Sequence, residues 1–425
     1  MNEIFPALPR KPQTRQLCAL QAPVQSRQKV SDPRRTSTPR RQSNLQDPRS
    51  SMIHLVAAQP SIAREPLEHD LEQSPLDRLL PYIEKPSGIG IEKPTPLQPA
   101  YDEAEERLRI GVEATYMFYF DDGLLEQLEA LLDGYRKSDE RTASGASKLS
   151  LAYERFIQKS TRIQPTETYL NQQLAKLDKW QKEQPDALSP KLIRALVLRE
   201  YAYATLNDTN LLNRQELRQL FLKRLEQEVA YLDAIKPEVA KRDPYWYVLM
   251  LEARGAQRAP KAELFTLLDE ASKTFPNELH IYLKAAGSIA TNSISPIDDV
   301  ESVAILAAVR AESQGASAYY ARTYWYIINR IVGAQNIGLL KIDWGRFAEG
   351  ANAIIAKYPV QWNIQHFAAF LCFGGDAKTV HQLFKSIEGR PIRQAWGDFA
   401  IHDKCRDWAA DPVNQYGKNK VPLEQ

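Results

Sequence analysis

Residues 319–330 read YYARTYWYIINR and open the stretch that decides the fold. From Tyr319 to Ile387 apolar residues recur at the three- and four-residue spacing of amphipathic helices. The spacing predicts four such helices in two antiparallel pairs, and it contains no recognisable catalytic motif. The aromatic side chains expected to pack these helices are Tyr319, Tyr320, Tyr324, Trp325, Tyr326, Trp344, Phe347, Tyr358, Trp362, Phe367 and Phe370.

Helical periodicity also runs upstream of this stretch. The predicted helices cover residues 166–181, 189–201, 216–235, 244–251, 261–275, 279 onward and 297–312. Three short strings each follow one predicted helix and begin the next: Pro244-Tyr245-Trp246, Pro276-Asn277-Glu278-Leu279 and Pro359-Val360-Gln361-Trp362. Their prolines lie 32 and 83 residues apart, and the longer interval fits two units of about 41 residues, within the range of helical-pair repeats.

A helical pair buries its apolar face only by stacking on neighbouring pairs, so repeats of this kind share one continuous core. The sequence therefore predicts an all-α fold. Residues 161–410 are expected to form an irregular α/α, tetratricopeptide-like helical-repeat array, preceded by an N-terminal helical unit over residues 101–160. No glycine-rich phosphate loop follows a strand anywhere in the chain, which argues against a nucleotide-binding fold.

The leading helical unit carries a family resemblance. LEALLDGYRKS at residues 128–138, followed by Arg141-Thr142, Ser144-Gly145 and Lys148-Leu149-Ser150, resembles a bacterial family classed as a domain of unknown function. YARTYWY at 320–326, Asp343-Trp344 and YPVQWN at 358–363 look similar to it too. In that family a leading helical segment precedes tetratricopeptide-like helical pairs. The resemblance covers roughly residues 101–390 and implies a fold, with no activity and no catalytic residue.

Residues 1–100 differ in composition from the rest of the chain. They contain 15 of the 27 prolines, and residues 1–50 contain 10 Lys and Arg against 3 Asp and Glu. Their sparse apolar residues cannot repay the entropy lost on ordering. We therefore predict a disordered, basic, proline-rich tail and linker over residues 1–100, and a flexible C-terminal tail over residues 411–425. Met1 and Met52 are both possible starts.

Charge, hydropathy and cysteine content restrict the partners and the compartment. The net charge of +2 gives no reason to expect a specific nucleic-acid partner, and no apolar run approaches the ~18 residues that span a bilayer. Cys18, Cys372 and Cys405 are an odd number, far apart, which argues against a disulfide framework and favours a reducing compartment. A cytoplasmic location is expected, with signal-independent export left open.

The candidate binding residues come from the two faces of the 319–330 tract. One stripe contains Tyr320, Thr323, Tyr324, Ile327 and Ile331, and the other contains Tyr319, Arg322, Tyr326 and Arg330. The inner helices of repeat arrays line binding surfaces, and Tyr and Arg are enriched in binding hot spots. The residues expected to contact a protein or peptide partner are Tyr319, Arg322, Tyr326, Arg330, Trp362 and His366. The competing interpretation is that both stripes are core, since an internal helix packs on both sides.

The sequence contains few residues in patterns typical of catalytic or metal-binding sites. His366 precedes Cys372, and His402-Asp403-Lys404-Cys405 is a compact polar cluster, but neither has metal-ligand spacing. Cys372 lies in an apolar run and is predicted to be an inert buried thiol. The pairs Asp121-Asp122 and Asp298-Asp299 fit helix caps better than an acid/base pair. No cofactor and no metal are expected.

These observations favour a non-enzymatic helical-repeat scaffold that binds a protein or peptide partner on its concave face. Two alternatives remain. One is an enzyme whose C-terminal helices form a pocket around His366, Trp362 and Tyr324. The other is an exported or host-delivered protein that uses residues 1–100 as an address signal. The sequence does not name the partner or the oligomeric state.

Overall fold

Helices account for nearly all the secondary structure in the computed structural model. The structure describes residues 105, 109, 111, 112, 115, 118–160, 166–207, 214–292, 296–311, 315–388 and 390–416. Within these residues there is no β-strand, and Arg141 and Ser147 form an isolated antiparallel bridge. The predicted all-α fold is therefore confirmed. The predicted tail over residues 1–100 lies outside the described residues.

The described helices follow one another with short connections. In chain order they are α3 (Leu125–Ser138), α4 (Lys148–Ser160), α5 (Glu167–Glu183), α6 (Ser189–Ala204), α7 (Arg214–Val239), α8 (Tyr245–Ala256), α9 (Lys261–Thr274), α10 (Leu279–Asn292), α11 (Pro296–Arg310), α12 (Ala316–Ile327), α13 (Trp344–Lys357), α14 (Gln361–Phe373), α15 (Ala377–Phe384), α16 (Arg393–Trp396), α17 (Phe399–Ala410) and α18 (Pro412–Tyr416). A π-turn at Ile328–Val332 and a 3-10 helix at Ala334–Leu339 connect α12 to α13.

The helix starts lie where the sequence predicts them. Helices α8, α10 and α14 begin within three residues of Pro244, Pro276 and Pro359, and the four helices predicted between residues 319 and 387 are α12 to α15. Carboxylates satisfy free backbone donors at several of these starts. Asp243 Oδ1 accepts a hydrogen bond from the Tyr245 amide at 2.9 Å, and Asp343 Oδ1 accepts one from the Arg346 amide at 3.1 Å.

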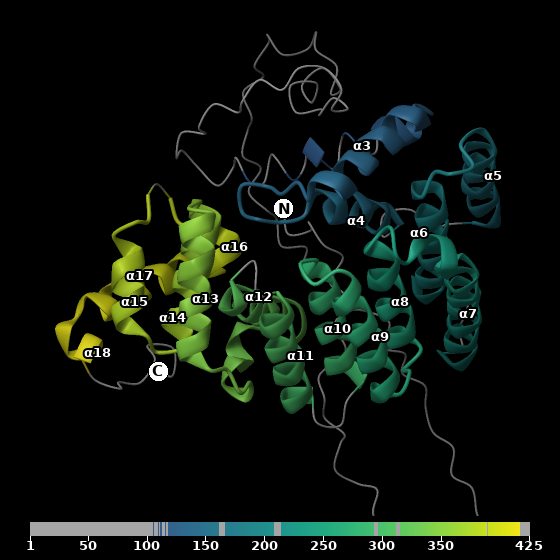
Figure 1. Cartoon of the computed structure of the whole chain (residues 1–425). Coiled ribbons are helices and arrows are strands. Elements are labelled where there is room, and N and C mark those ends of the chain that lie inside the picture. Colours follow the sequence, from purple (N-terminus) through teal and green to yellow (C-terminus); the bar gives the residue numbers. More distant parts are fainter. Residues whose placement is uncertain are drawn as a thin grey trace, which may run out of the picture. The chain divides into compact units, whose positions relative to one another are not determined.

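Each helix from α5 to α14 packs against the next helix in the chain, and α15 packs against α17. In addition, α4, α6, α8, α10 and α12 pack against one another in series (Figure 1). We call these five helices the even row. One cluster of buried apolar side chains extends from Val112 to Ala409 through this arrangement. Because helices of the even row have neighbours on several sides, they are apolar on most faces; in α8, nine of the 12 residues are buried.

The first stripe of the 319–330 tract is core. Tyr320, Thr323, Tyr324 and Ile327 are all fully buried. Their burial agrees with the expectation that a helix with two apolar stripes is internal. The second stripe divides: Tyr319 is buried, whereas Arg322, Tyr326 and Arg330 are partly exposed.

Cys372 is buried as predicted, but the prediction that it is an inert free thiol, and the argument against a disulfide, are wrong. Cys372 in α14 and Cys405 in α17 form a disulfide, with an S–S distance of 2.01 Å and both side chains fully buried. The two cysteines are 33 positions apart in sequence, so local spacing does not predict the pairing; α15 and α16 lie between α14 and α17 in the chain, and the fold brings those two helices together. The bond links the last helices of the chain to the array.

The predicted C-terminal tail over residues 411–425 begins with the short helix α18, and residues after 416 lie outside the described part. Among the described helices, none has the length and apolar character needed to cross a membrane.

Candidate functional site

The six residues predicted to contact a partner fall into two groups in the structure. Tyr326 and Arg330 lie beside a charged cluster on the even row. The others surround the loop over residues 139–147, which joins α3 to α4. These are Tyr319, Arg322, Trp362 and His366. The single stripe expected from helical spacing is therefore split between two places.

Tyr319 and Arg322 point toward this loop and the start of α10. The Tyr319 hydroxyl donates to the Asn277 carbonyl at 2.6 Å, and its ring meets Tyr282 edge-on with centroids 5.8 Å apart. Arg322 Nη2 donates to the Ser144 carbonyl and to Asn363 Oδ1. Both side chains hold together parts of the chain that are distant in sequence.

His366 is enclosed between two tryptophans. Its ring centroid lies 4.8 Å from Trp325 and 4.6 Å from Trp362. Nδ1 lies 2.7 Å from the Trp362 carbonyl, which only accepts hydrogen bonds, so Nδ1 carries the proton. Burial lowers the pKa of His366 to about 3. The imidazole is therefore neutral at physiological pH and acts as a packing element.

Of the three residues expected to surround an enzyme pocket, His366 and Trp362 are in contact, whereas Tyr324 makes its hydrogen bonds elsewhere. Tyr324 is fully buried and donates to Glu301 Oε2 at 2.5 Å, on the side of α11. Tyr320 donates to the same oxygen at 3.0 Å. No hydrogen bond or ring contact joins Tyr324 to His366 or Trp362 within the part of the chain that the structure describes.

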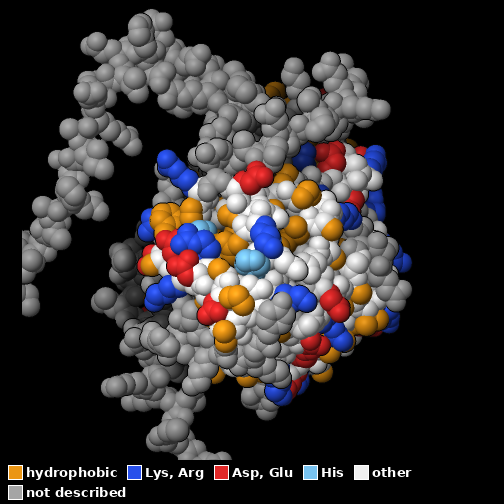
Figure 2. Space-filling view, turned by 90° about the vertical axis from the view of Figure 1, so that its left-hand side faces the viewer, with side chains coloured by type: hydrophobic (Ala, Val, Ile, Leu, Met, Phe, Trp, Pro, Cys, Tyr) orange, Lys and Arg blue, Asp and Glu red, His pale blue; other side chains and the backbone are white. Residues whose placement is uncertain are grey.

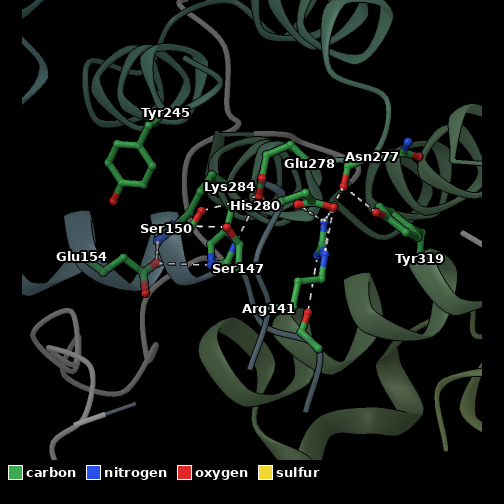
Figure 3. A network of polar contacts seen from close by, with 12 residues as sticks. Arg141, Ser147, Ser150, Glu154, Tyr245, Asn277, Glu278, His280, Lys284 and Tyr319 are labelled. Carbon is green, nitrogen blue, oxygen red and sulfur yellow. Dashed lines mark hydrogen bonds and ion pairs between the residues drawn. The ribbon is translucent and has the colours of Figure 1, made fainter. Parts of the chain in front are cut away.

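A charged cluster that sequence reasoning missed lies among the helices of the even row (Figure 3). Lys284 in α10 places Nζ 3.3 Å from Glu154 Oε1 of α4 and 3.0 Å from Glu252 Oε1 of α8. Burial alone would lower the pKa of Lys284, but the Glu252 carboxylate, together with Tyr326 and Glu154, outweighs burial and raises it. Lys284 is therefore a permanent cation between two carboxylates.

Arg199 of α6 extends the cluster. It donates from Nη1 to Glu252 Oε2 at 2.5 Å and from Nε to Glu228 Oε1 at 2.9 Å. A further bond reaches the Leu249 carbonyl. Burial would raise the pKa of Glu252, but Lys284 and Arg199 lower it overall. We call these residues the Lys284 cluster: Glu154, Arg199, Glu228, Glu252 and Lys284.

The network continues from this cluster to the 139–147 loop (Figure 3). His280 Nε2 lies 3.8 Å from Glu154 Oε1, and His280 Nδ1 lies 3.3 Å from Glu278 Oε1, off the line of a hydrogen bond. The Glu278 carboxylate also accepts from the His280 amide at 3.1 Å. Burial acts to raise the pKa of Glu278, but the contacts with His280 lower it overall. Arg141 and Tyr319 meet at the Asn277 carbonyl and end the network.

Four polar atoms inside the network have no hydrogen-bond partner among the described residues. They are Glu154 Oε2, Glu228 Oε2, His280 Nδ1 and the Tyr245 hydroxyl, and all four residues are buried. The Tyr245 ring stacks on Tyr153 with centroids 4.5 Å apart, and its hydroxyl points toward the side where Glu154 lies (Figure 3). Burial, reinforced by the Glu154 carboxylate, raises the pKa of Tyr245. The hydroxyl is therefore protonated and does not act as a base.

Tyr326 and Arg330 border the Lys284 cluster. Lys284 Nζ lies 5.9 Å from the centre of the Tyr326 ring. The ring packs so closely on Gly287 of α10 that a Cβ there would lie 3.1 Å from it. Burial lowers the pKa of Arg330, and attraction to Glu154 only partly offsets the shift. These two side chains are partly exposed, as residues that contact a partner must be.

One sequence signal could have revealed the Lys284 cluster. Lys284 interrupts LHIYLKAAGSIATN, a helix that is otherwise apolar on nearly every face. A lysine placed there must find carboxylates inside the protein, because an unpaired buried charge is strongly unfavourable. The sequence does not say which carboxylates, since Glu154 and Glu252 lie on other helices.

Basic side chains gather a second time on the C-terminal helices. Lys378, His381, Gln382, Lys385 and Gln415 line a hollow of about 180 Å³ between α15 and α18. Figure 2 shows the face of these helices, where basic and histidine side chains lie beside hydrophobic ones. Phe399 is 52% exposed and Val413 is 67% exposed. His402 packs on Phe384 and Trp396.

No group of three His, Cys, Asp or Glu side chains in the described ranges is placed to hold a metal ion. The arrangement as a whole offers buried ion pairs, neutral packing rings and a partly exposed Tyr–Arg edge.

Comparisons of the chain with protein-family models, with curated proteins and with solved structures found no significant match. The resemblance to the bacterial family stays a prediction, and the argument for function rests on the geometry of this chain.

Proposed function

We propose that the protein is a non-enzymatic scaffold, built as a tetratricopeptide-like helical-repeat array, that binds an extended segment of a partner protein over the even row. One observation carries the proposal: the partly exposed Tyr326 and Arg330 sit next to the Lys284 cluster, and the cluster draws its side chains from α4, α6, α8 and α10 together with Glu228 of α7. Repeat arrays bind extended segments along such rows of stacked helices.

The contact residues of this proposal are narrower than the sequence suggests. Tyr326 and Arg330 remain, because they are partly exposed and lie beside charged groups. Tyr319 and His366 are buried, and Trp362 is occupied by His366 and Arg109. A Tyr–Arg edge beside a rigid ion-pair cluster suits a hot spot, since both residue types supply large contact area and directed donors.

The proposal is tested by photo-crosslinking in the cells that make the protein. A photoreactive phenylalanine analogue replaces Tyr326 in one variant and Val309 in another. Val309 is 57% exposed on α11, outside the even row. We expect discrete crosslinked products from position 326 alone, and we expect Arg330→Glu to abolish them. Equal labelling from both positions, or none from 326, would contradict the proposal.

A second candidate, an exported or host-delivered protein, is favoured by the Cys372–Cys405 disulfide. Structural disulfides form and persist in oxidising compartments and are rare in the cytosol. The test is to trap free thiols with an alkylating reagent at the moment of harvest and to map peptides without reduction. A linked peptide pair containing Cys372 and Cys405 is expected after export. Full alkylation of both cysteines would instead favour the cytoplasm.

A further inference from the structure

The hollow between α15 and α18 is lined by side chains that carry hydrogen-bond donors, and none of the lining residues is acidic. Lys378, His381, Gln382 and Lys385 come from α15 and its C-cap, and Gln415 comes from α18. The volume of about 180 Å³ exceeds the ~10–15 Å³ that one ordered water requires and stays below the ~300 Å³ at which drug-sized sites begin. The hollow therefore has room for one small polar group and part of the molecule that carries it.

Helix geometry places the four residues of the α15 segment on one side. Steps of three and four residues separate positions 378, 381, 382 and 385, and such steps return to the same face of a helix. Lys385 keeps helical backbone angles, with φ −69° and ψ −20°, so this face continues through the C-cap. At ~1.5 Å per residue the two lysines lie about 10 Å apart along the axis, and their long flexible side chains cover this distance from either end. Both ammonium groups can therefore reach one group bound in the hollow.

The positive charge of these two lysines is not neutralised within the part of the chain that the structure describes. There, the ammonium groups of Lys378 and Lys385 have no carboxylate within ion-pair distance and no hydrogen-bond acceptor. Exposed lysines elsewhere do pair: Lys341 Nζ lies 2.5 Å from Asp298 Oδ1. The lysines of the hollow therefore differ from an ordinary exposed lysine of this protein in having no anion beside them.

The stability of α15 does not account for the position of Lys378. This lysine lies in the first turn of the helix, where the helix dipole disfavours a cation. The carboxylate nearest to it in sequence belongs to Asp376, and its Oδ1 accepts a hydrogen bond from the Thr379 amide at 3.0 Å as the N-cap. Lys385, at the other end of the helix, is the one lysine of the two that the dipole favours. A bound anion would supply the favourable partner that Lys378 lacks.

A phosphate group matches the hollow in charge and in hydrogen bonding. It carries −1.5 to −2 at pH 7, against the two lysine charges, whereas a carboxylate carries only one negative charge. Lysine binds phosphate as a point charge, and the carboxamide of Gln382 and the ring of His381 add neutral N–H donors. Gln415 Nε2 donates to the Ala409 carbonyl at 2.8 Å, which fixes its carboxamide at the α18 side of the hollow.

From this geometry we infer that the hollow between α15 and α18 binds one phosphate group, held by Lys378 and Lys385 with Gln382 as a neutral donor. Free inorganic phosphate and a phosphomonoester on a partner segment share this chemistry. The inference goes beyond the scaffold proposal, because the site lies on the C-terminal helices and includes neither Tyr326 nor Arg330.

Isothermal titration of the full chain with inorganic phosphate tests the site, in chloride buffer of matched ionic strength. Lys378→Gln and Lys385→Gln should each weaken binding about tenfold, since each removes a charge-assisted hydrogen bond. Both lysines are exposed, so both variants are expected to fold. The matched control is Lys404→Gln: Lys404 is an exposed lysine of the neighbouring helix α17 that does not line the hollow, and its variant should bind phosphate as the wild type does.

Two further arms identify the source of the phosphate. They use one phosphoserine peptide and the same peptide without phosphate. If the phosphopeptide binds more tightly than inorganic phosphate, the site recognises a phosphate on a partner; if it binds equally or more weakly, the site takes the free ion. Either result supports the site. Three outcomes would overturn it: no phosphate binding in the low-millimolar range, unchanged binding by both hollow variants, or an equal loss in Lys404→Gln, which would show that the attraction is spread over the surface.

Discussion

The Lys284 cluster and the region around Arg322 both contain cations that the fold withdraws from water, but they are neutralised in different ways. Lys284 lies between Glu154 and Glu252, and Arg199 pairs with Glu228 and with the same Glu252. Arg322 lies on α12, two helices further along the even row than α8. Its guanidinium contacts the Ser144 carbonyl, the Asn363 side-chain oxygen and the rings of Trp325 and Phe367.

This difference indicates what each region is for. A buried charge is tolerated when it is paired and hydrogen-bonded, and Lys284 and Arg199 each have two carboxylate partners inside the cluster. The Lys284 cluster therefore fixes how α4, α6, α8 and α10 pack. Arg322 has no carboxylate within ion-pair distance among the described residues, and a carbonyl, an amide oxygen and two aromatic rings contact its guanidinium instead.

The largest expected effect comes from breaking the paired region. Arg199→Met leaves the fully buried Glu228 without its cation. We expect the free energy of unfolding to fall by about 3–5 kcal/mol, the range for removing one partner of a buried pair. Urea denaturation at pH 7 measures the change. Arg194→Met is the control: its partner Asp178 is 67% exposed, so the loss should stay below about 1 kcal/mol.

Removing the disulfide tests whether the helical array, which contains both regions, unfolds in one cooperative transition. Replacing Cys372 and Cys405 with serine removes a bridge across 33 residues, and the expected loss under oxidising conditions is about 2–4 kcal/mol. If α14 and α17 share the core of the array, the double variant should still melt in a single transition, at a lower temperature. Adding reductant to the wild type should reproduce the effect. A separate early transition would show that the C-terminal helices are an independent unit.

Much of the fold is readable from local sequence. Pro244, Pro276 and Pro359 lie in the short connections between helices, because proline lacks an amide hydrogen and disfavours the helical conformation in the residue before it. The four-residue spacing of Tyr320 and Tyr324 likewise identifies the buried side of α12, because residues four apart lie on one face of a helix. Such signals lie within a few residues of the feature that they predict.

The charged cluster and the surroundings of Arg322 depend on contacts between distant parts of the chain, which helical periodicity does not predict. Helical spacing places Arg322 on a face, but the carbonyl that it contacts is 178 residues earlier, in the loop at Ser144. Lys284 likewise finds Glu154 and Glu252 on other helices, and Cys372 finds Cys405 only because α17 returns to α14. A single sequence predicts on which face of its helix a side chain lies. Which residue of another helix it contacts is known only from the packed structure.

A smaller effect concerns the link between the two regions, the Glu278–His280 contact. Because the pKa of Glu278 is lowered on folding, its carboxylate stabilises the protein above the unfolded pKa of about 4.3, and the contribution is lost as pH falls through the folded pKa. Glu278→Gln should cost about 1–3 kcal/mol at pH 7. Its stability should also decline less than that of the wild type on acidification below pH 4.5. Parallel pH profiles of the two proteins would contradict the assignment.

The smallest effect on stability is expected for substitution of Arg322. Its size shows whether Arg322 and Arg199 differ in their contribution to stability. Arg322→Gln removes two hydrogen bonds, but it also removes an unmatched charge from a partly desolvated place, and the two changes oppose each other. In chloride buffer we expect the free energy of unfolding to change by less than about 1 kcal/mol, in contrast to Arg199→Met. A loss near 3 kcal/mol would mean that Arg322 is a structural residue like Arg199, and the distinction between the two regions would disappear.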